Sequence, residues 1–207
     1  MKKILIGAMA LAAVSLTGCN EAERLASQVE GTWSSTPQML VNDAGSQATL
    51  VETITFERDS AKTGGPVVIV GMVSSTGAMT GSDALVQPFE IAASAKSTVT
   101  GRWTAVDDDE IMLALDVANM SVAVDPSGLV ISGNVLDGAT QSNPEALKPQ
   151  FASMVEAALR RQLLARYTSM TKLDDVKVKD NGSLLKFEIG KTDYVYSSQN
   201  PSAALSK

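Results

Sequence analysis

Short segments of alternating apolar and polar residues recur along most of this chain, and they restrict the fold more than any other feature of the sequence. Residues 111–117 show the pattern most clearly, because every second side chain from Ile111 to Val117 is apolar and faces one side of an extended strand. Turn-forming residues such as Asn181-Gly182 separate neighbouring segments and favour tight connections between antiparallel strands. The sequence therefore predicts a mainly β fold, an antiparallel meander of about eight or nine strands that closes into a barrel.

One late segment departs from the strand pattern and has the spacing of a helix. Asn143 is a favourable N-cap residue, and Pro144 suits the first position of a helix. Apolar residues then recur at intervals of three and four up to Tyr167, with charged side chains between them. We expect one amphipathic helix over residues 144–167, inserted late in the chain and followed by about three strands.

A Gly-x-Trp sequence occurs twice, at Gly31-Thr32-Trp33 and at Gly101-Arg102-Trp103, where glycine lets a strand bend or lets a ring pack against the backbone. The first copy resembles the signature of lipocalins. The second, followed by an acidic turn and an alternating strand, is similar to the middle of lipocalin-like envelope lipoproteins. The hairpin over Asn181-Gly182 and the strand Tyr194-Val195-Tyr196 fit the same pattern. The resemblance implies a lipocalin-like β-barrel domain over residues 29–198.

A lipocalin-like barrel implies an interior that holds a small apolar or amphipathic ligand. The segment from Val67 to Val73 is largely apolar on both faces, which predicts a barrel wall next to apolar material. The residues expected to line the cavity are Trp33, Ile69, Met72, Trp103 and Leu113. Core packing is the simpler explanation for both tryptophans, and methionines fill irregular cores as well as adaptable cavities.

The N-terminal residues have the layout of a bacterial export signal. Lys2 and Lys3 precede an apolar run from Ile4 to Val14 that is too short to span a bilayer. Leu16-Thr17-Gly18-Cys19 then resembles the lipobox of bacterial lipoproteins, which implies cleavage before Cys19 and acylation of its sulfur and its new amino group. An ordinary signal peptide with a chance cysteine is the alternative. The expected parts of the chain are a lipoprotein signal peptide over 1–18, a lipidated tether over 19–28, the barrel domain over 29–198 and a flexible tail over 199–207.

Charge and cysteine content narrow the possible partners and the compartment. Cleavage leaves 189 residues (207 minus 18) and removes Lys2 and Lys3, so 15 basic residues face 23 acidic ones, a net charge of −8. An acidic surface argues against a nucleic-acid partner and against docking on anionic lipid by charge, so acyl chains would hold the protein to its membrane. Cys19 is the only cysteine, which leaves no disulfide.

We expect a protein anchored in the cell envelope. The resemblance to bacterial lipoproteins implies the outer membrane, with which Asn20 after the cysteine is compatible, and the domain would face either the periplasm or the outside.

The sequence provides little chemistry for catalysis. It contains no histidine, which removes the commonest general base, the commonest zinc ligand and the usual catalytic triads. The carboxylates of Asp107-Asp108-Asp109-Glu110 lack the glycine that a calcium loop requires, so we expect a solvated turn there. Gly64-Gly65-Pro66 lacks the Lys and Ser/Thr of a phosphate-binding loop. We therefore expect no catalytic residue, no metal site and no cofactor.

Three functions from different classes are compatible with these features. The first is an envelope lipoprotein whose barrel binds a small apolar or amphipathic ligand by burying apolar surface. The second is a structural or assembly factor that contacts another envelope protein through the helix or the barrel exterior, for which Leu159, Leu163 and Leu164 provide apolar surface. The third is a hydrolase, which a strongly perturbed carboxylate in a deep cleft would support. The sequence favours the first.

Overall fold

The computed structural model describes residues 20–79, 89–133, 136–137, 140–141 and 143–199, so the expected signal peptide and Cys19 lie outside the described residues. The strands are β1 (Gly31–Ser35), β2 (Gln38–Asp43), β3 (Ser46–Phe56), β4 (Gly64–Met79), β5 (Phe89–Ala105), β6 (Ile111–Leu115), β7 (Ser121–Val124), β8 (Val130–Ser132), β9 (Leu136–Asp137), β10 (Thr140–Gln141), β11 (Lys172–Lys179), β12 (Leu184–Ile189) and β13 (Thr192–Ser198). The long helix is α2 (Pro144–Ser169), and the short 3-10 helices are η1 (Val117–Asn119), η2 (Pro126–Gly128) and η3 (Asp180–Gly182).

Eight strands close into an antiparallel barrel in the order β1-β13-β12-β11-β6-β5-β4-β3, and β3 pairs back to β1. At the closure, Trp33 is aligned with Ile54 on one side and with Ser198 on the other. Three outer strands extend the sheet, because β2 pairs with β3 while β7 and β8 pair with β5. The predicted mainly β fold, with an antiparallel barrel and one late helix, is confirmed.

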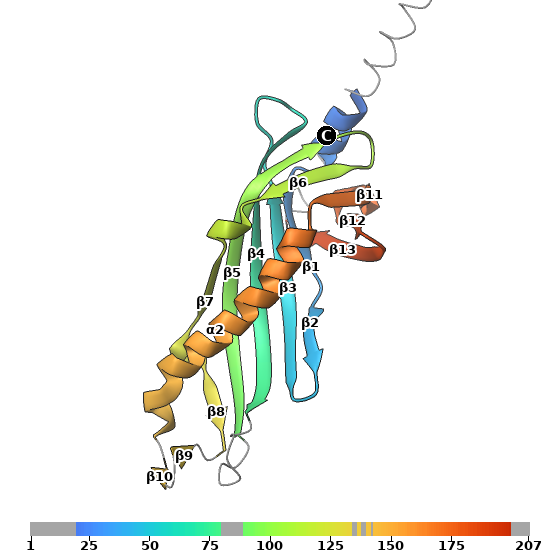
Figure 1. Ribbon diagram of the computed structural model, residues 1–207. Coiled ribbons are helices and arrows are strands. Elements are labelled where there is room, and N and C mark those ends of the chain that lie inside the picture. The colour runs from blue at the N-terminus through green and yellow to red at the C-terminus, as the bar shows by residue number, and fades with distance from the viewer. Residues whose placement is uncertain (1–19, 80–88, 134–135, 138–139, 142, 200–207) are drawn as a thin grey trace, which may run out of the picture.

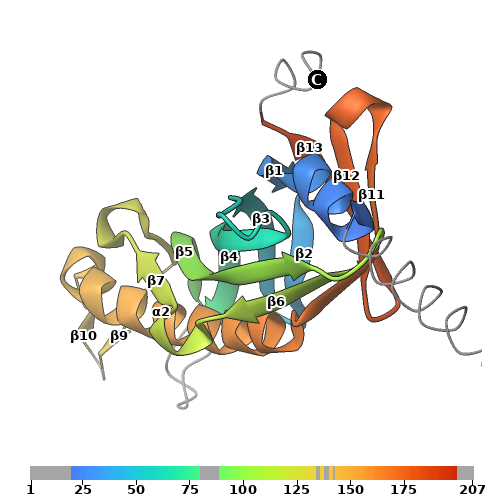
Figure 2. The same cartoon turned by 90° about the horizontal axis from the view of Figure 1, so that it is seen from above.

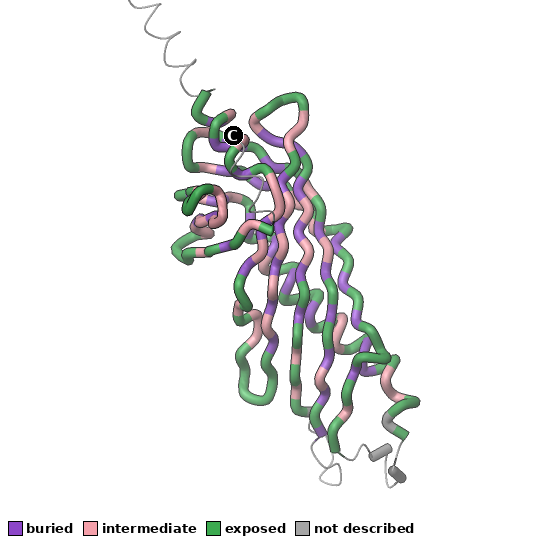
Figure 3. The backbone as a smooth tube through the Cα atoms, turned by 180° about the vertical axis from the view of Figure 1, so that it is seen from behind, coloured by how far each residue is buried: buried purple, intermediate pink, exposed green. Residues whose placement is uncertain are grey.

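The strands β3, β4 and β5 have 11, 16 and 17 residues, whereas the barrel strand β6 has 5. The three long strands therefore extend beyond the barrel and give the molecule two different ends. At one end these strands belong to the barrel, and at the other they form an open sheet that α2 crosses (Figure 1). Seen along its length, the molecule has the barrel strands beside a sheet with α2 on one face (Figure 2). Buried and exposed positions alternate along the strands, so one face of the sheet is covered and the other is open to solvent (Figure 3).

Strand β5 is one continuous strand of 17 residues from Phe89 to Ala105. In the structure Lys96 points to the exposed face while its neighbours Ala95 and Ser97 are buried, so the period-two pattern continues without interruption.

The helix α2 begins where the sequence predicts and ends two residues later than expected. The side chain of Asn143 accepts a hydrogen bond from the backbone N–H of Glu145 at 3.1 Å and thereby caps the helix. Phe151, Leu159, Leu163 and Tyr167 are buried against the sheet, and the Phe151 and Phe89 rings lie 5.4 Å apart. The buried stripe spans the helix from the open end of the sheet to the barrel.

Residues 20–29 form a helix that packs against the barrel, which corrects the expectation of a tether over 19–28. Ala22, Leu25, Ala26 and Val29 recur at helical spacing and are all buried, so the segment belongs to the core. It lies beside β1 and the β11–β12 hairpin (Figure 2). The first strand begins only at Gly31, because Val29 completes the buried stripe of this helix.

Two further expectations concern membranes and the C-terminal tail. Within the part of the chain that the structure describes, no helix combines the length and the apolar character needed to cross a membrane. The expected tail over 199–207 lies outside the described residues except for Gln199, whose N–H donates to the carbonyl of Thr32 at 2.9 Å.

Candidate functional site

A groove of about 380 Å³ lies between α2 and the open end of the sheet. Its sheet wall includes Ala48, Ser75, Gly77 and Ile91, and its helix wall includes Val155, Ala158 and Leu159. The volume falls in the lower part of the range typical of small-ligand sites, and most of these side chains are apolar or small.

The groove exists because small side chains fill the sheet beneath it. Strand register aligns Ala48 of β3 with Ser75 of β4, and Ser75 in turn with Ala93 of β5. The methyl and hydroxymethyl groups of this row cannot reach the helix, so space remains between the two layers. Gly77 adds to it, because a methyl group at this position would meet only Ser46 Oγ, at 3.5 Å.

The mouth of the groove mixes polar and apolar groups. Asp43 and Gln47 on the sheet and Arg161 and Gln162 on the helix contribute the polar part of the lining. Met154 contributes the apolar part and is 46% exposed, which is high for a flexible apolar side chain in a folded domain. The combination of an apolar floor and a polar mouth suits a ligand with an apolar body and a polar end.

The residues expected to line a barrel cavity are divided between the core and the surface. Trp33, Ile69, Trp103 and Leu113 are buried, and Trp103 is aligned with Leu113 across β5 and β6. Met72 is 52% exposed, because it lies on the solvent face of β4 and points away from the interior. None of these five residues lines the groove beside α2.

Both tryptophans have the contacts of packed core residues. The indole N–H of Trp33 donates to the carbonyl of Val29 at 2.8 Å, and that of Trp103 donates to the carbonyl of Glu57 at 2.9 Å. The Trp103 ring also meets Phe56 edge-on, with ring centroids 5.2 Å apart. Each indole therefore has its polar atom satisfied and its ring covered within the protein.

A buried charged cluster joins the C-terminal end of α2 to the barrel. Glu52 of β3 is fully buried, and its carboxylate accepts hydrogen bonds from Arg166 at 2.9 and 2.5 Å and from Tyr196 at 2.7 Å. Arg166 also donates to the side chain of Gln38 at 2.8 Å and lies over the ring of Tyr194. Sequence reasoning missed Glu52, although it sits on the inward-facing side of a strand that otherwise presents apolar residues.

The environment of this cluster fixes the protonation of its members. Burial lowers the pKa of Arg166, but the hydrogen bonds and the charge of Glu52 more than reverse this effect, so the pKa is raised overall. Burial raises the pKa of Tyr196 and Tyr167 well above the ordinary value, and the negative charge of Glu52 raises both further. Both phenols and the Arg166 guanidinium therefore keep their protons, and the hydrogen bonds among Glu52, Arg166 and Tyr196 connect α2 to the barrel.

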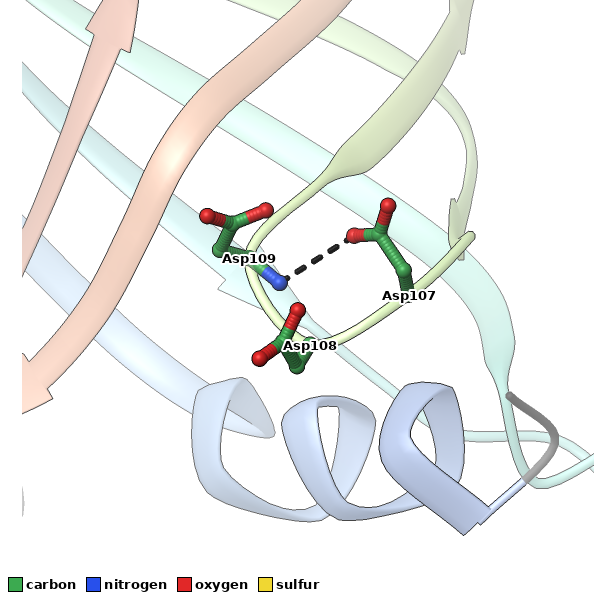
Figure 4. A group of neighbouring side chains, drawn as sticks. All are labelled: Asp107, Asp108 and Asp109. Atoms are coloured by element: carbon green, nitrogen blue, oxygen red, sulfur yellow. Dashed lines mark hydrogen bonds between the residues drawn. The ribbon is translucent and has the colours of Figure 1, made fainter. Parts of the chain in front are cut away.

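The acidic turn between β5 and β6 brings the carboxylates of Asp107, Asp108 and Asp109 within 4.8 Å of one another (Figure 4). Asp107 Oδ1 accepts a hydrogen bond from the backbone N–H of Asp109 at 3.2 Å, and the Asp109 carbonyl accepts one from Val176. Loss of hydration next to the surrounding protein and, after it, the charges of the neighbouring carboxylates raise the pKa of the exposed Asp109. The contacts are those of a strand-connecting turn, with the aspartates in their usual role.

Two other hollows offer less to an apolar ligand. A cleft of about 1010 Å³ at the barrel end is lined by helix 20–29, Trp33, Arg58 and the tip of the β11–β12 hairpin, and polar or charged residues make up most of this lining. A hollow of about 350 Å³ on the sheet is lined largely by serine, threonine and alanine side chains, including Thr49, Ser74 and Ser94. The groove beside α2 is therefore the strongest candidate site.

Comparisons with known proteins give no relative for this chain. No family model matches it, and neither a curated protein nor a solved structure does. The groove and the charged cluster must therefore be interpreted from their own geometry.

Proposed function

We propose that this protein is a lipid-anchored cell-envelope protein that binds a small apolar or amphipathic ligand in the groove beside α2. The observation that carries the proposal is the groove itself, an apolar hollow of about 380 Å³ between a helix and a sheet row of small side chains. The anchor and the envelope location rest on the N-terminal sequence, which resembles that of bacterial lipoproteins.

The groove suits this ligand class better than the barrel interior does. Trp33, Ile69, Trp103 and Leu113 are buried, and both indole N–H groups are hydrogen-bonded within the protein. Ala48, Ser75 and Ala158, in contrast, line the groove. A ligand there would gain affinity mainly by burying apolar area, and the polar mouth would receive its polar end. We propose a binding protein rather than an enzyme, because the buried carboxylate Glu52 is engaged by Arg166 and Tyr196.

A pair of tryptophan variants tests the groove directly. The probe is an environment-sensitive fluorescent fatty acid, titrated into the mature chain carrying Cys19→Ser so that no acyl anchor competes. Ala158→Trp places an indole in the groove and should weaken binding at least about tenfold, the effect of losing about 1.4 kcal/mol of contact. Ala157→Trp is the matched control, because Ala157 is exposed and lies outside the lining. Absence of probe binding, or equal affinity of the two variants, would refute the proposal.

A second candidate function is docking of another envelope protein on the barrel exterior. Val51 is aligned with Met72 across β3 and β4, and Val70 and Val68 follow on the same solvent-facing side. These side chains form a continuous apolar strip, and such strips occur at protein interfaces. A photo-crosslinking residue in place of Met72 should then trap one discrete partner in intact cells, whereas the same residue in place of exposed Asp193 should not. Identical crosslinking patterns at both positions would count against this function.

A further inference from the structure

The connection between the expected anchor and the folded domain is very short. The described part of this helix starts at Asn20, and Ala22 is already buried in the core. Because Cys19 is bonded directly to Asn20, a single peptide link joins it to a residue of the packed helix. No flexible spacer therefore separates an acyl group on Cys19 from the folded domain.

Helix 20–29 is held firmly to the barrel. Leu25, Ala26 and Val29 are each at most 1% exposed, and Val29 receives the indole N–H of Trp33. Two ion pairs add to this attachment at the helix surface and its C-terminal end, Glu23 with Lys62 at 3.5 Å and Glu30 with Arg58 at 2.7 Å. Because the helix is packed into the core, it cannot turn independently of the barrel, and a group attached to its start also orients the barrel.

The groove lies far from this end of the molecule. Strand β5 runs from Ala105, next to the Asp107–Asp109 turn at the barrel end, to Phe89, which packs on Phe151 at the other end. Its 17 residues span about 55 Å at 3.3 Å per residue, and Ala93, in the row beneath the groove, lies about 40 Å from Ala105. Figure 4 shows the acidic turn next to helix 20–29, so both mark the same end.

We propose that the barrel end carrying helix 20–29 and the Asp107–Asp109 turn faces the lipid bilayer, and that the body extends away from it with the groove at the far end. This inference rests on the anchoring proposed above. The mature net charge of −8 opposes lying flat on anionic lipid, so the orientation is set by the acyl anchor and the packed helix 20–29 rather than by surface charge. The groove would then lie about 40 Å from the membrane that holds the anchor, and its ligand would not come directly from that membrane.

Energy transfer to the membrane surface tests this orientation in the complete lipidated protein. Because acylation consumes the only native thiol, a single new cysteine can be labelled with a donor dye. Asp108→Cys marks the barrel end and Gln150→Cys marks the far end, and both positions are exposed. The proteins are reconstituted in vesicles of phosphatidylethanolamine and phosphatidylglycerol with an acceptor dye on a small fraction of the headgroups.

We expect transfer from position 108 to exceed transfer from position 150 by at least about threefold, because about 50 Å separates the two positions along β5. A flexible Gly-Ser segment of about twelve residues inserted before Ala22 should shrink that difference, since it restores a tether. Equal transfer from both positions with the protein still on vesicles would overturn the orientation but leave the anchor intact. Loss of vesicle association would overturn both.

Discussion

Glu52 of β3 and Arg166 in the last turn of α2 lie 114 residues apart in the sequence but form a two-pronged ion pair inside the protein. The pair connects the barrel to the one helix that covers the open sheet. It therefore fixes the C-terminal end of α2, while the middle of the helix, residues 154–162, forms one wall of the groove. The position of that wall depends on a contact near the C-terminal end of the same helix.

Removing one member of this pair should strongly destabilise the fold. In Arg166→Met, the Glu52 carboxylate stays buried without its cation, which costs about 3–5 kcal/mol of unfolding free energy. The double variant Glu52→Gln/Arg166→Met should recover more than half of that loss, because glutamine is neutral and still accepts from Tyr196. Urea unfolding measures all three proteins. Arg161→Met on the exposed face is the control, and a comparable loss there would show that the ion pair has no special role.

The raised pKa values of Tyr167 and Tyr196 predict a loss of stability at high pH. In the unfolded chain both phenols ionise near pH 10, whereas in the folded protein both stay protonated at higher pH. Above pH 10 the folded state therefore binds more protons than the unfolded state, and the unfolding free energy falls as pH rises. The contribution of the two protonated phenols to the unfolding free energy is fully present below pH 10 and is lost as the pH rises further. The slope should be about −1.4 kcal/mol per pH unit for each tyrosine.

The variants Tyr167→Phe and Tyr196→Phe separate the two contributions. Each should make the alkaline decline in unfolding free energy shallower by about 1.4 kcal/mol per pH unit. Urea unfolding at several pH values between neutrality and the alkaline limit provides the slopes. An unchanged slope in both variants would mean that the phenols ionise at the same pH whether the chain is folded or not.

Two glycines of the long sheet should respond in opposite ways to an added methyl group. At Gly101 a Cβ would lie 2.4 Å from the carbonyl oxygen of Ala114, so Gly101→Ala must displace backbone at the β5–β6 pairing and should cost about 1–3 kcal/mol. At Gly77 the nearest atom is 3.5 Å away, and Gly77→Ala should leave stability unchanged or raise it by up to about 1 kcal/mol. Thermal unfolding of the two variants distinguishes them. Equal effects would contradict the close approach of β6 at Gly101 and the open space at Gly77.

The glycines of the two Gly-x-Trp sequences, Gly31 and Gly101, are required for different physical reasons. In the second copy Gly101 is required because strand β6 approaches its backbone closely. In the first copy Gly31 is required because its φ is +138°, a value that other residues rarely adopt. The sequence alone indicated that both glycines serve a strand with a packed tryptophan, but it did not indicate that the physical reasons differ.

The barrel was predictable because alternation, turn residues and a capped helix are local signals. The groove was not, because it depends on register: Ala48, Ser75 and Ala93 are unremarkable in sequence and meet only when three strands align. Met72 was placed wrongly in the interior because a segment that is apolar on both sides does not reveal which side faces inward. Glu52 could have been noticed, since alternation places it between Leu50 and Ile54 on the inward-facing side.

The helix over residues 20–29 should contribute to stability as a part of the core, which an unstructured tether could not. Leu25 is 1% exposed, so Leu25→Ala should lower the unfolding free energy by about 2–5 kcal/mol through lost contacts and the cavity left behind. Gln28→Ala on the exposed side of the same helix should change it by less than about 0.5 kcal/mol. Urea unfolding of the mature Cys19→Ser chain measures both. If the two substitutions had equal, small effects, the helix would not be packed in solution, and the rigid connection between the proposed anchor and the barrel would be lost with it.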